Sequence, residues 1–340
     1  MDMTGRLRFG KGSGTPDGRN MRIDQTSADH GGDIDAAIAR FGGVRADWLD
    51  LSTGINRLPY PVPRLPPPVW RDLPDSNVTA ALEKAARTFW SVPAEAAVLA
   101  APGASSLIAR IPALMPAGSV AIPGPTYNEH ARAFRALGWT LAKGQTSARV
   151  VVHPNNPDGR LWEADCTAPL MVIDESFGDV AAHQSLIALA SRPGTLVLKS
   201  FGKFWGLAGL RLGFAIGDPA LVAGLARMLG PWPVSGAALA IGTAALDDLG
   251  WADRTRRRLH LDAQKLDVMM TAAGTQVVGG TDLFRLYDVG VAHAWQDHLA
   301  SLHIWTRRFP YSDRWLRLGL PGSRDEWDRL ASALSTRPRT

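Results

Sequence analysis

Short apolar segments alternate with helical patterns through the middle of this 340-residue chain, and this alternation limits the possible folds most. Near-continuous apolar strands separated by helices are typical of a parallel sheet covered on both faces. The sequence therefore predicts an α/β fold with a mostly parallel central sheet. The apolar segments are AAVLAAP (96–102), GSVAIPG (118–124), ARVVVHP (148–154), LMVIDES (170–176) and TLVLKSF (195–201).

The pattern changes near residue 235, which predicts a division of the chain. We expect a large domain over 76–235, followed by an interdomain helix and a small α+β domain over 236–340, where TDLFRLYDV and WLRLGLP are typical of short strands. Residues 29–75 form an N-terminal arm whose last part, LPYPVPRLPPPVWRDLPD, is predicted to be extended because proline disfavours helix. Residues 1–28, rich in glycine and polar side chains, are predicted to be a flexible tail.

The formal charge of +5 and the basic run RTRRR (254–258) raise the possibility of nucleic-acid binding. The run shares a helical pattern with Leu259, Leu261 and Leu266, which favours a solvated helix face, and no zinc-ligand or RNA-binding spacing accompanies it. No stretch is long and apolar enough for a signal peptide or a membrane span, and the lone Cys166 is compatible with a reducing compartment. We therefore expect a cytoplasmic protein without nucleic-acid, membrane or metal partners.

Several polar or small residues follow predicted strands, and ligands in open α/β sheets bind beyond the carboxyl ends of the strands. Gly103, Ala104 and Ser105 form a strand-to-helix turn whose backbone N–H groups could hold a phosphate. Tyr127 follows the next strand, where an aromatic ring can stack on a ligand or close the core. Asn156 lies in a turn bracketed by prolines. Taken singly, each feature has an ordinary structural explanation.

The strongest signal comes from the last two segments of the alternation. Asp174 ends a very apolar strand, where a buried carboxylate is costly without a cationic partner. Ser200, Lys203 and Arg211 follow where the chain leaves strand 195–201 and approaches a strand over 212–216. Lys199 is a competing amine, but it lies within a strand, whereas Lys203 lies in a glycine-bounded loop that gives its side chain room to move.

Pyridoxal 5′-phosphate uses all of these groups together. It needs a lysine for a Schiff base, a carboxylate at its pyridine nitrogen, donors for its phosphate and a face on which its ring can stack. We therefore predict that Lys203 binds this cofactor and that Ser200 and Arg211 contact its phosphate beside the Gly103 turn.

Three motifs, HPNNPDG, IDES and SFGKFWGLAGLRLG, resemble those of fold-type I pyridoxal-phosphate enzymes in the aspartate aminotransferase superfamily, close to histidinol-phosphate aminotransferases. In addition, HGGDIDAAIARFGG, DWLDLSTGINRLPYPVPRLP and RDLPDS resemble the threonine-phosphate decarboxylase-like proteins of cobalamin biosynthesis, from about His30 to near the C-terminus. The resemblance implies a large domain that binds the cofactor, a smaller C-terminal domain and a homodimer.

The resemblance also assigns roles to individual residues. Lys203 would be the Schiff-base lysine, Asp174 the partner of the pyridinium nitrogen and Asn156 the partner of the ring hydroxyl oxygen. Tyr127 would stack on the ring. The residues assigned to the cofactor phosphate are Ala104, Ser105, Ser200 and Arg211.

Substrate contacts and departures from the family follow from the same resemblance. Arg317 would bind the substrate α-carboxylate with Arg307 nearby, and His30 would lie near the substrate phosphate. Phe177 stands where many aminotransferases have a tyrosine that donates to the ring hydroxyl. Leu73 replaces a tyrosine that reaches the cofactor phosphate across the dimer interface in histidinol-phosphate aminotransferases.

The activity implied is decarboxylation of L-threonine O-3-phosphate to (R)-1-aminopropan-2-ol O-2-phosphate in cobalamin biosynthesis. Two alternatives stay open at this point. The chain could be a histidinol-phosphate aminotransferase or a related class I or II aminotransferase, or a cofactor-binding partner in a cobalamin-pathway complex that does not turn over substrate. A nicotinamide-dependent dehydrogenase is disfavoured because the sequence has no GxGxxG fingerprint.

Overall fold

A computed structural model describes residues 30–164 and 167–336 of the chain. From Gly31 onward the described residues form one compact unit. The predicted flexible tail and Cys166 lie outside the described residues. The domain boundaries at residues 75 and 235 stay predictions.

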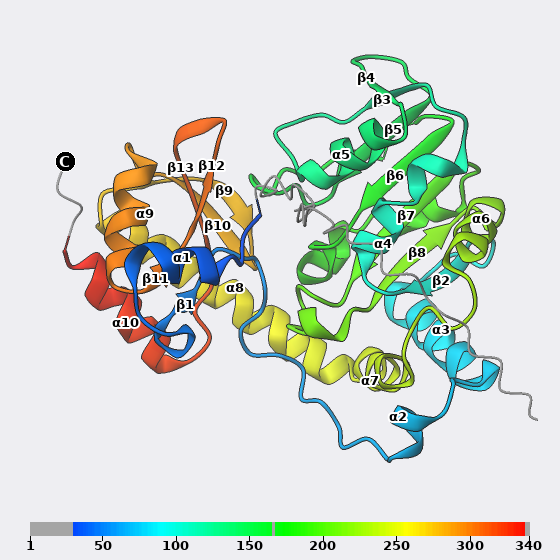
Figure 1. The fold of residues 1–340 in the computed structure, drawn as a ribbon, viewed down its shortest axis with the longest axis horizontal. Helices are drawn as coiled ribbons and strands as arrows, with labels where there is room; N and C mark the ends of the chain where they lie inside the picture. The colour runs from blue at the N-terminus through cyan, green and yellow to red at the C-terminus, as the bar shows by residue number, and fades with distance from the viewer. Residues whose placement is uncertain (1–29, 165–166, 337–340) are drawn as a thin grey trace, which may run out of the picture. The chain divides into compact units, whose positions relative to one another are not determined.

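The large sheet is mixed but mostly parallel (Figure 1). One strand, β8, runs antiparallel to both of its neighbours, whereas the other neighbouring pairs are parallel. The predicted mostly parallel sheet is thereby confirmed. In spatial order the strands are β2 (Ala97–Ala101), β8 (Gly213–Gly217), β7 (Thr195–Ser200), β6 (Leu170–Asp174), β5 (Ala148–Val152), β3 (Ser119–Ala121) and β4 (Thr140–Leu141).

Both faces of this sheet are covered, as successive strand residues show. Val172 and Ile173 of β6 belong to different hydrophobic clusters, and so do Leu196 and Val197 of β7. Side chains alternate between the two faces of a strand, so each cluster fills one side of the sheet. The helices of this part of the chain are α3 (Ser76–Trp90), α4 (Ala104–Ile108), α5 (Asn128–Ala136), α6 (Pro219–Leu229) and the 3-10 helices η2 (Ile111–Leu114), η3 (Gly178–Gln184), η4 (Ile187–Ser191) and η5 (Ala208–Leu210).

A smaller antiparallel sheet follows in the C-terminal part of the chain. Its spatial order is β12 (Arg307–Phe309), β13 (Ser312–Gly319), β10 (Phe284–Asp288) and β9 (Gln276–Thr281), and the two predicted strands correspond to β10 and β13. A second, two-stranded parallel sheet joins β1 (Leu49–Asp50) of the arm to β11 (Ile304–Trp305). The remaining elements are α1 (Ile34–Phe41), η1 (Arg45–Asp47), α2 (Pro68–Arg71), α7 (Gly236–Asp247), α8 (Leu249–Ala272), α9 (Ala292–Ser301) and α10 (Arg324–Leu334).

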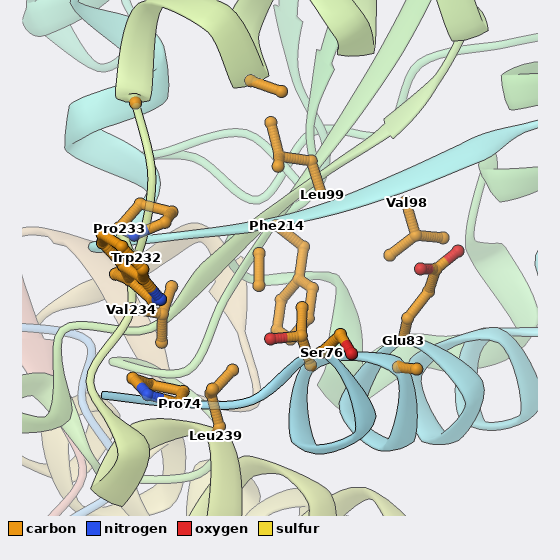
Figure 2. Close-up of a pocket in the computed structure, with 15 residues that line it drawn as sticks. Pro74, Ser76, Glu83, Val98, Leu99, Phe214, Trp232, Pro233, Val234 and Leu239 are labelled. Atoms are coloured by element: carbon orange, nitrogen blue, oxygen red, sulfur yellow. The ribbon is translucent and has the colours of Figure 1, made fainter. Parts of the chain in front are cut away.

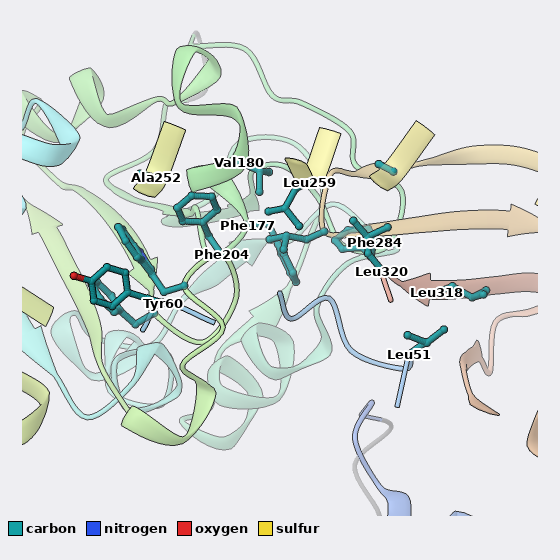
Figure 3. Close-up of a cluster of buried hydrophobic side chains, with 14 of the residues drawn as sticks. Leu51, Tyr60, Phe177, Val180, Phe204, Ala252, Leu259, Phe284, Leu318 and Leu320 are labelled. Carbon is teal, nitrogen blue, oxygen red and sulfur yellow. The ribbon is translucent and has the colours of Figure 1, made fainter. Parts of the chain in front are cut away.

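One hydrophobic cluster extends from the large sheet to the small one (Figure 3). Phe177 follows β6 and packs edge-on against Phe284 of β10, with ring centroids 4.9 Å apart. Gly54 of the arm fits between them, because a Cβ at this position would lie 2.8 Å from each ring. This shared core brings the end of β6 close to the small sheet.

Two local predictions need correction. The proline-rich segment is not extended throughout, because residues 68–71 form the single-turn helix α2; proline is compatible with the first turn of a helix, where its missing N–H is not needed. The basic run does not lie wholly on a solvated face. Arg254 and Arg257 are exposed, but Arg256 and Arg258 are half-buried and hydrogen-bonded, and Leu261 is 64% exposed.

Within the described residues, no helix combines the length and apolar character that a membrane crossing requires. The same part of the chain contains no cluster of three or more His, Cys, Asp or Glu side chains arranged to hold a metal ion.

Candidate active site

Lys203 lies in the loop of residues 201–212, which connects β7 to β8 and which we call the lysine loop. Its Nζ is 5.4 Å from the centre of the Phe177 ring. Burial lowers the pKa of Lys203 to about 8, with Arg317 and Arg211 acting in the same direction and Asp174 opposing them. A large fraction of this amine is neutral near pH 8 and able to act as a nucleophile or base.

The N-terminal arm holds the backbone of the lysine loop. The backbone N–H of Asn56 donates to the carbonyl of Lys203 at 3.0 Å, and its side-chain Nδ2 donates to the carbonyl of Phe204 at 2.9 Å. Tyr60 N–H donates to the Trp205 carbonyl at 2.9 Å. Three consecutive carbonyls of the loop are thus fixed by residues that lie far away in the sequence.

Asp174 is 2% exposed at the end of β6. Burial by itself would raise the pKa of this carboxyl, but hydrogen bonds and charge from His130, with further bonds from Ser176, outweigh burial and lower it. His130 Nε2 lies 2.8 Å from Asp174 Oδ2, while the Ser176 hydroxyl and N–H donate to Oδ1 at 2.6 and 3.0 Å. The site therefore contains a buried, ionised carboxylate, which is what a protonated ring nitrogen requires as a partner.

Tyr127 is half-buried at the start of α5, and its ring centroid is 6.1 Å from that of His130. Burial, followed by the charges of Glu129 and Asp174, raises the pKa of its hydroxyl to about 12, against the effect of Arg211. Tyr127 thus lies within electrostatic reach of both Asp174 and Arg211, in the neighbourhood where a stacking aromatic was predicted.

The predicted phosphate residues meet where β2, β7 and β8 come together. Ser200 pairs with Gly213 in the sheet, and Gly213 also pairs with Ala101, just before Gly103. Gly103 has φ +81°, a backbone conformation that favours glycine, and the Arg211 guanidinium lies 2.6 Å from where a Cβ would stand. Ala104 is buried beside the turn, whereas Ser105 is exposed.

Arg317 enters the site from β13 of the small sheet and is 5% exposed. Its guanidinium donates a short hydrogen bond to Oδ1 of Asn156 and another, of 2.7 Å, to the carbonyl of Ser52. Arg307 of β12 is its partner in the strand register, so the two arginines are neighbours as predicted. The predicted contact of Asn156 with a ring hydroxyl stays a prediction.

The chain is similar to known proteins over most of its length. A model of the family "Aminotransferase class I and II" matches residues 67–150 and 140–334. The chain belongs to the class I and II aminotransferases. The chain is 39% identical to a threonine-phosphate decarboxylase from Sinorhizobium sp. over 326 residues, which cover 90% of this chain and 97% of that protein.

A threonine-phosphate decarboxylase from Pseudomonas aeruginosa is 38% identical over 327 residues, with the same two coverages. Among solved structures, the histidinol-phosphate aminotransferase of Sinorhizobium meliloti in complex with pyridoxal-5′-phosphate superposes with a TM-score of 0.75 at 19% identity, over 93% of this chain and 96% of that one. The structural match confirms the predicted fold of this aminotransferase-family chain.

Lys199, the competing amine of this aminotransferase-family chain, forms ion pairs with two carboxylates. It is 1% exposed, and its Nζ lies 2.5 Å from Glu175 Oε2 and 3.7 Å from Asp179 Oδ1. Burial alone would raise the pKa of Glu175, but Lys199 together with the Ser185 hydroxyl and the Leu186 N–H lowers it. An amine enclosed in such an ion pair is a poor nucleophile, which favours Lys203.

The two departures from the family pattern differ in their surroundings. Phe177 is 5% exposed and faces Lys203, so no hydroxyl is presented from this position. Leu73 is 64% exposed in the arm. His30 is exposed at the start of the described chain, and its predicted role near a substrate phosphate stays a prediction.

Sequence reasoning missed several residues of this candidate site. His130 and Ser176 hold Asp174, while Ser52 and Asn56 hold Arg317 and the lysine loop. One signal was available: His130 follows Tyr127 by three residues and lies in the first turn of α5. The two arm residues carry no local signal, because their partners are distant in the sequence.

Proposed function

We propose that this chain is a pyridoxal-phosphate-dependent decarboxylase that converts L-threonine O-3-phosphate to (R)-1-aminopropan-2-ol O-2-phosphate in cobalamin biosynthesis. The convergence of Lys203, the ionised Asp174 and Arg317 in one site carries the proposal. The choice of substrate is supported by near-full-length similarity to two threonine-phosphate decarboxylases.

The residues present fit the proposed cofactor. Lys203 would bind its aldehyde, Asp174 its ring nitrogen and the Gly103 turn with Ser200 and Arg211 its phosphate. The close approach of the Arg211 guanidinium to the Gly103 turn supports an anion site there. When bound, pyridoxal phosphate supplies an acceptor for the electrons released when a bond at the substrate Cα breaks.

The chain's own residues would then control which bond at the substrate Cα breaks and which group supplies the proton that Cα receives. Decarboxylation breaks the bond between Cα and the carboxylate, releases carbon dioxide and leaves an electron pair at Cα that must take up a proton. Arg317 would orient the carboxylate, since a guanidinium pairs well with that group. Lys203, with a pKa of about 8, can hold the proton that Cα receives.

Carbon dioxide release without an amino acceptor tests this function. The pyridoxal-phosphate-loaded protein is incubated with L-threonine O-3-phosphate and no 2-oxo acid, and we expect repeated turnovers. Release that requires 2-oxoglutarate, or amino transfer from histidinol phosphate, would support the aminotransferase alternative instead. Cofactor binding without turnover in either assay would support the binding-partner alternative.

The proposed enzyme is a homodimer, and three large apolar side chains exposed to solvent support this. A cavity of about 470 Å³ opens between α3, β2 and the segment that leads into α7 (Figure 2). Trp232 lines it and is 58% exposed, while Trp70 and Leu73 of the arm are 69% and 64% exposed. Large exposed apolar groups mark association sites.

Light scattering coupled to size-exclusion chromatography checks the assembly, with a mass of twice 36.5 kDa expected. Trp232→Asp should shift the protein toward monomer, and a wild-type monomer at micromolar concentration would contradict the dimer.

The small-molecule substrate is the other proposed partner. A cytoplasmic location stays a prediction.

A further inference from the structure

The basic run on α8 divides into two pairs of arginines. Arg254 and Arg257 are exposed and make no hydrogen bond or ion pair with any residue that the structure describes. Arg256 and Arg258 instead turn toward the protein, with side-chain exposures of 23% and 29% in their ion pairs. The inward pair contacts two groups that hold the lysine loop.

Arg258 acts on the loop through Asn56. Its Nη2 donates to Asn56 Oδ1 at 2.7 Å, and the Leu58 N–H donates to the same oxygen at 3.1 Å. An amide carries its oxygen and nitrogen on opposite sides, so two donors on Oδ1 direct Nδ2 away from them. Asn56, which is 3% exposed, directs this Nδ2 to the carbonyl of Phe204, the residue after Lys203.

Arg256 acts on the other side of the same loop. Its guanidinium carbon lies 5.3 Å from the centre of the Phe204 ring, and its Nε donates to the Asp179 carbonyl at 2.8 Å. The carboxylate of Asp179 in turn accepts a 3.2 Å hydrogen bond from the indole of Trp205. Both residues that follow Lys203 are therefore connected to α8.

The loop needs such support because of its composition. Residues 201–212 contain Gly202, Gly206 and Gly209, and glycine loses more conformational freedom on folding than other residues do. A loop of this kind keeps one conformation only when its surroundings fix it.

We propose that Arg256 and Arg258 are positioning residues for Lys203: acting through Asp179 and Asn56, they hold the lysine loop so that the Lys203 amine stays in its partly buried place beside Arg317 and Arg211. The inference rests on the proposed role of Lys203 as the reactive amine. It also assigns a role to two of the four arginines in the basic run 254–258, which the sequence pattern alone predicts to lie on a solvated helix face.

The test measures the acetylation rate of Lys203 against pH in cofactor-free protein, by mass spectrometry of its peptide, with the exposed Lys84 and Lys143 as internal references. The variants are Arg256→Met and Arg258→Met, and the matched controls in the same run are Arg254→Met and Arg257→Met. Asp174, Arg211 and Arg317, the charged groups that influence the Lys203 amine, are unchanged in all four.

In wild type we expect the midpoint near pH 8. A displaced amine gains water and leaves its cationic neighbours, so the midpoint should rise in both inward variants, and a rise of one unit lowers the reactivity at pH 8 about five-fold. The controls should match wild type. Variants that melt at lower temperature but keep the wild-type midpoint would overturn the proposal, as would equal shifts in the controls.

Asn56→Leu provides a second route if an arginine variant fails to fold. It removes the donor to Phe204 without adding a charge, so we expect the same upward shift of the Lys203 midpoint; an unchanged midpoint would count against the proposal. The measurement uses neither substrate nor cofactor. Its outcome is therefore independent of whether the loaded protein releases carbon dioxide.

Discussion

Two lysines four residues apart, Lys199 and Lys203, occupy opposite kinds of environment. Lys199 is enclosed between Glu175 and Asp179, with its Nζ 5.6 Å from the Trp90 ring centre. Lys203 has no ion pair among the described residues, faces the Phe177 ring and is influenced by two arginines. Burial next to anions makes a lysine structural, whereas burial next to cations makes it reactive.

The largest expected effect separates the two lysines by activity. Lys203→Ala should lower carbon dioxide release about ten-thousand-fold, because it removes the amine that the proposed chemistry requires. Steady-state assays with saturating cofactor measure this effect, and Lys84→Ala, at an exposed site, is the control. If Lys203→Ala kept a tenth of the activity, Lys203 would not be the reactive amine, and the proposed difference between the two lysines would be wrong.

Stability should separate the two lysines in the reverse order. Lys199→Met leaves Glu175 and Asp179 buried without their cation, which should lower the free energy of unfolding by about 3–5 kcal/mol. Lys203→Met should leave it unchanged or raised, since no ion pair of the described residues is broken. Urea denaturation measures both, and Glu175→Gln combined with Lys199→Met should recover part of the loss. Equal losses in the two single variants would show that both lysines are structural.

The pH dependence of stability sharpens the comparison further. The pKa of Lys203 is about 8 in the folded protein and 10.5 in its ordinary state, so between these values the unfolded chain holds a proton that the folded protein does not. Raising the pH through this window should therefore stabilise the cofactor-free protein relative to Lys203→Met, by at most about 1.4 kcal/mol per pH unit. Urea titrations from pH 7.5 to 10.5 test this sign; a difference that stays flat would place the Lys203 pKa at its ordinary value.

The smallest effect concerns the link between the two regions. Trp205 follows Lys203 in the loop and donates to Asp179, which also faces Lys199. Trp205→Phe removes this hydrogen bond and should lower the free energy of unfolding by about 1–3 kcal/mol. Trp90→Phe, which removes the shorter 2.8 Å bond to the same carboxylate, is the matched variant and should cost at least as much. A neutral Trp205→Phe would indicate that the two lysine regions are independent.

Much of the large sheet could be predicted because its signal is local. The runs that became β5, β6 and β7 are mostly apolar and are bounded by turn residues, and their carboxyl ends marked Asp174 and Lys203 as candidates. Arg256 and Arg258 show where such reasoning ends. A helical pattern places a charged residue on a boundary, but it does not say which group of another element lies opposite.

The sequence by itself determined the order of strands and helices, the family and the residue types gathered at the strand ends, because these depend on periodicity and on motifs that span few residues. Only the tertiary structure decided which groups meet. Arg317 reaches Asn156 across 161 residues and Ser52 across 265, and His130 reaches Asp174 across 44. It also placed Lys199 between two carboxylates and Lys203 under the influence of two arginines, because the fold decides which charged groups surround each amine.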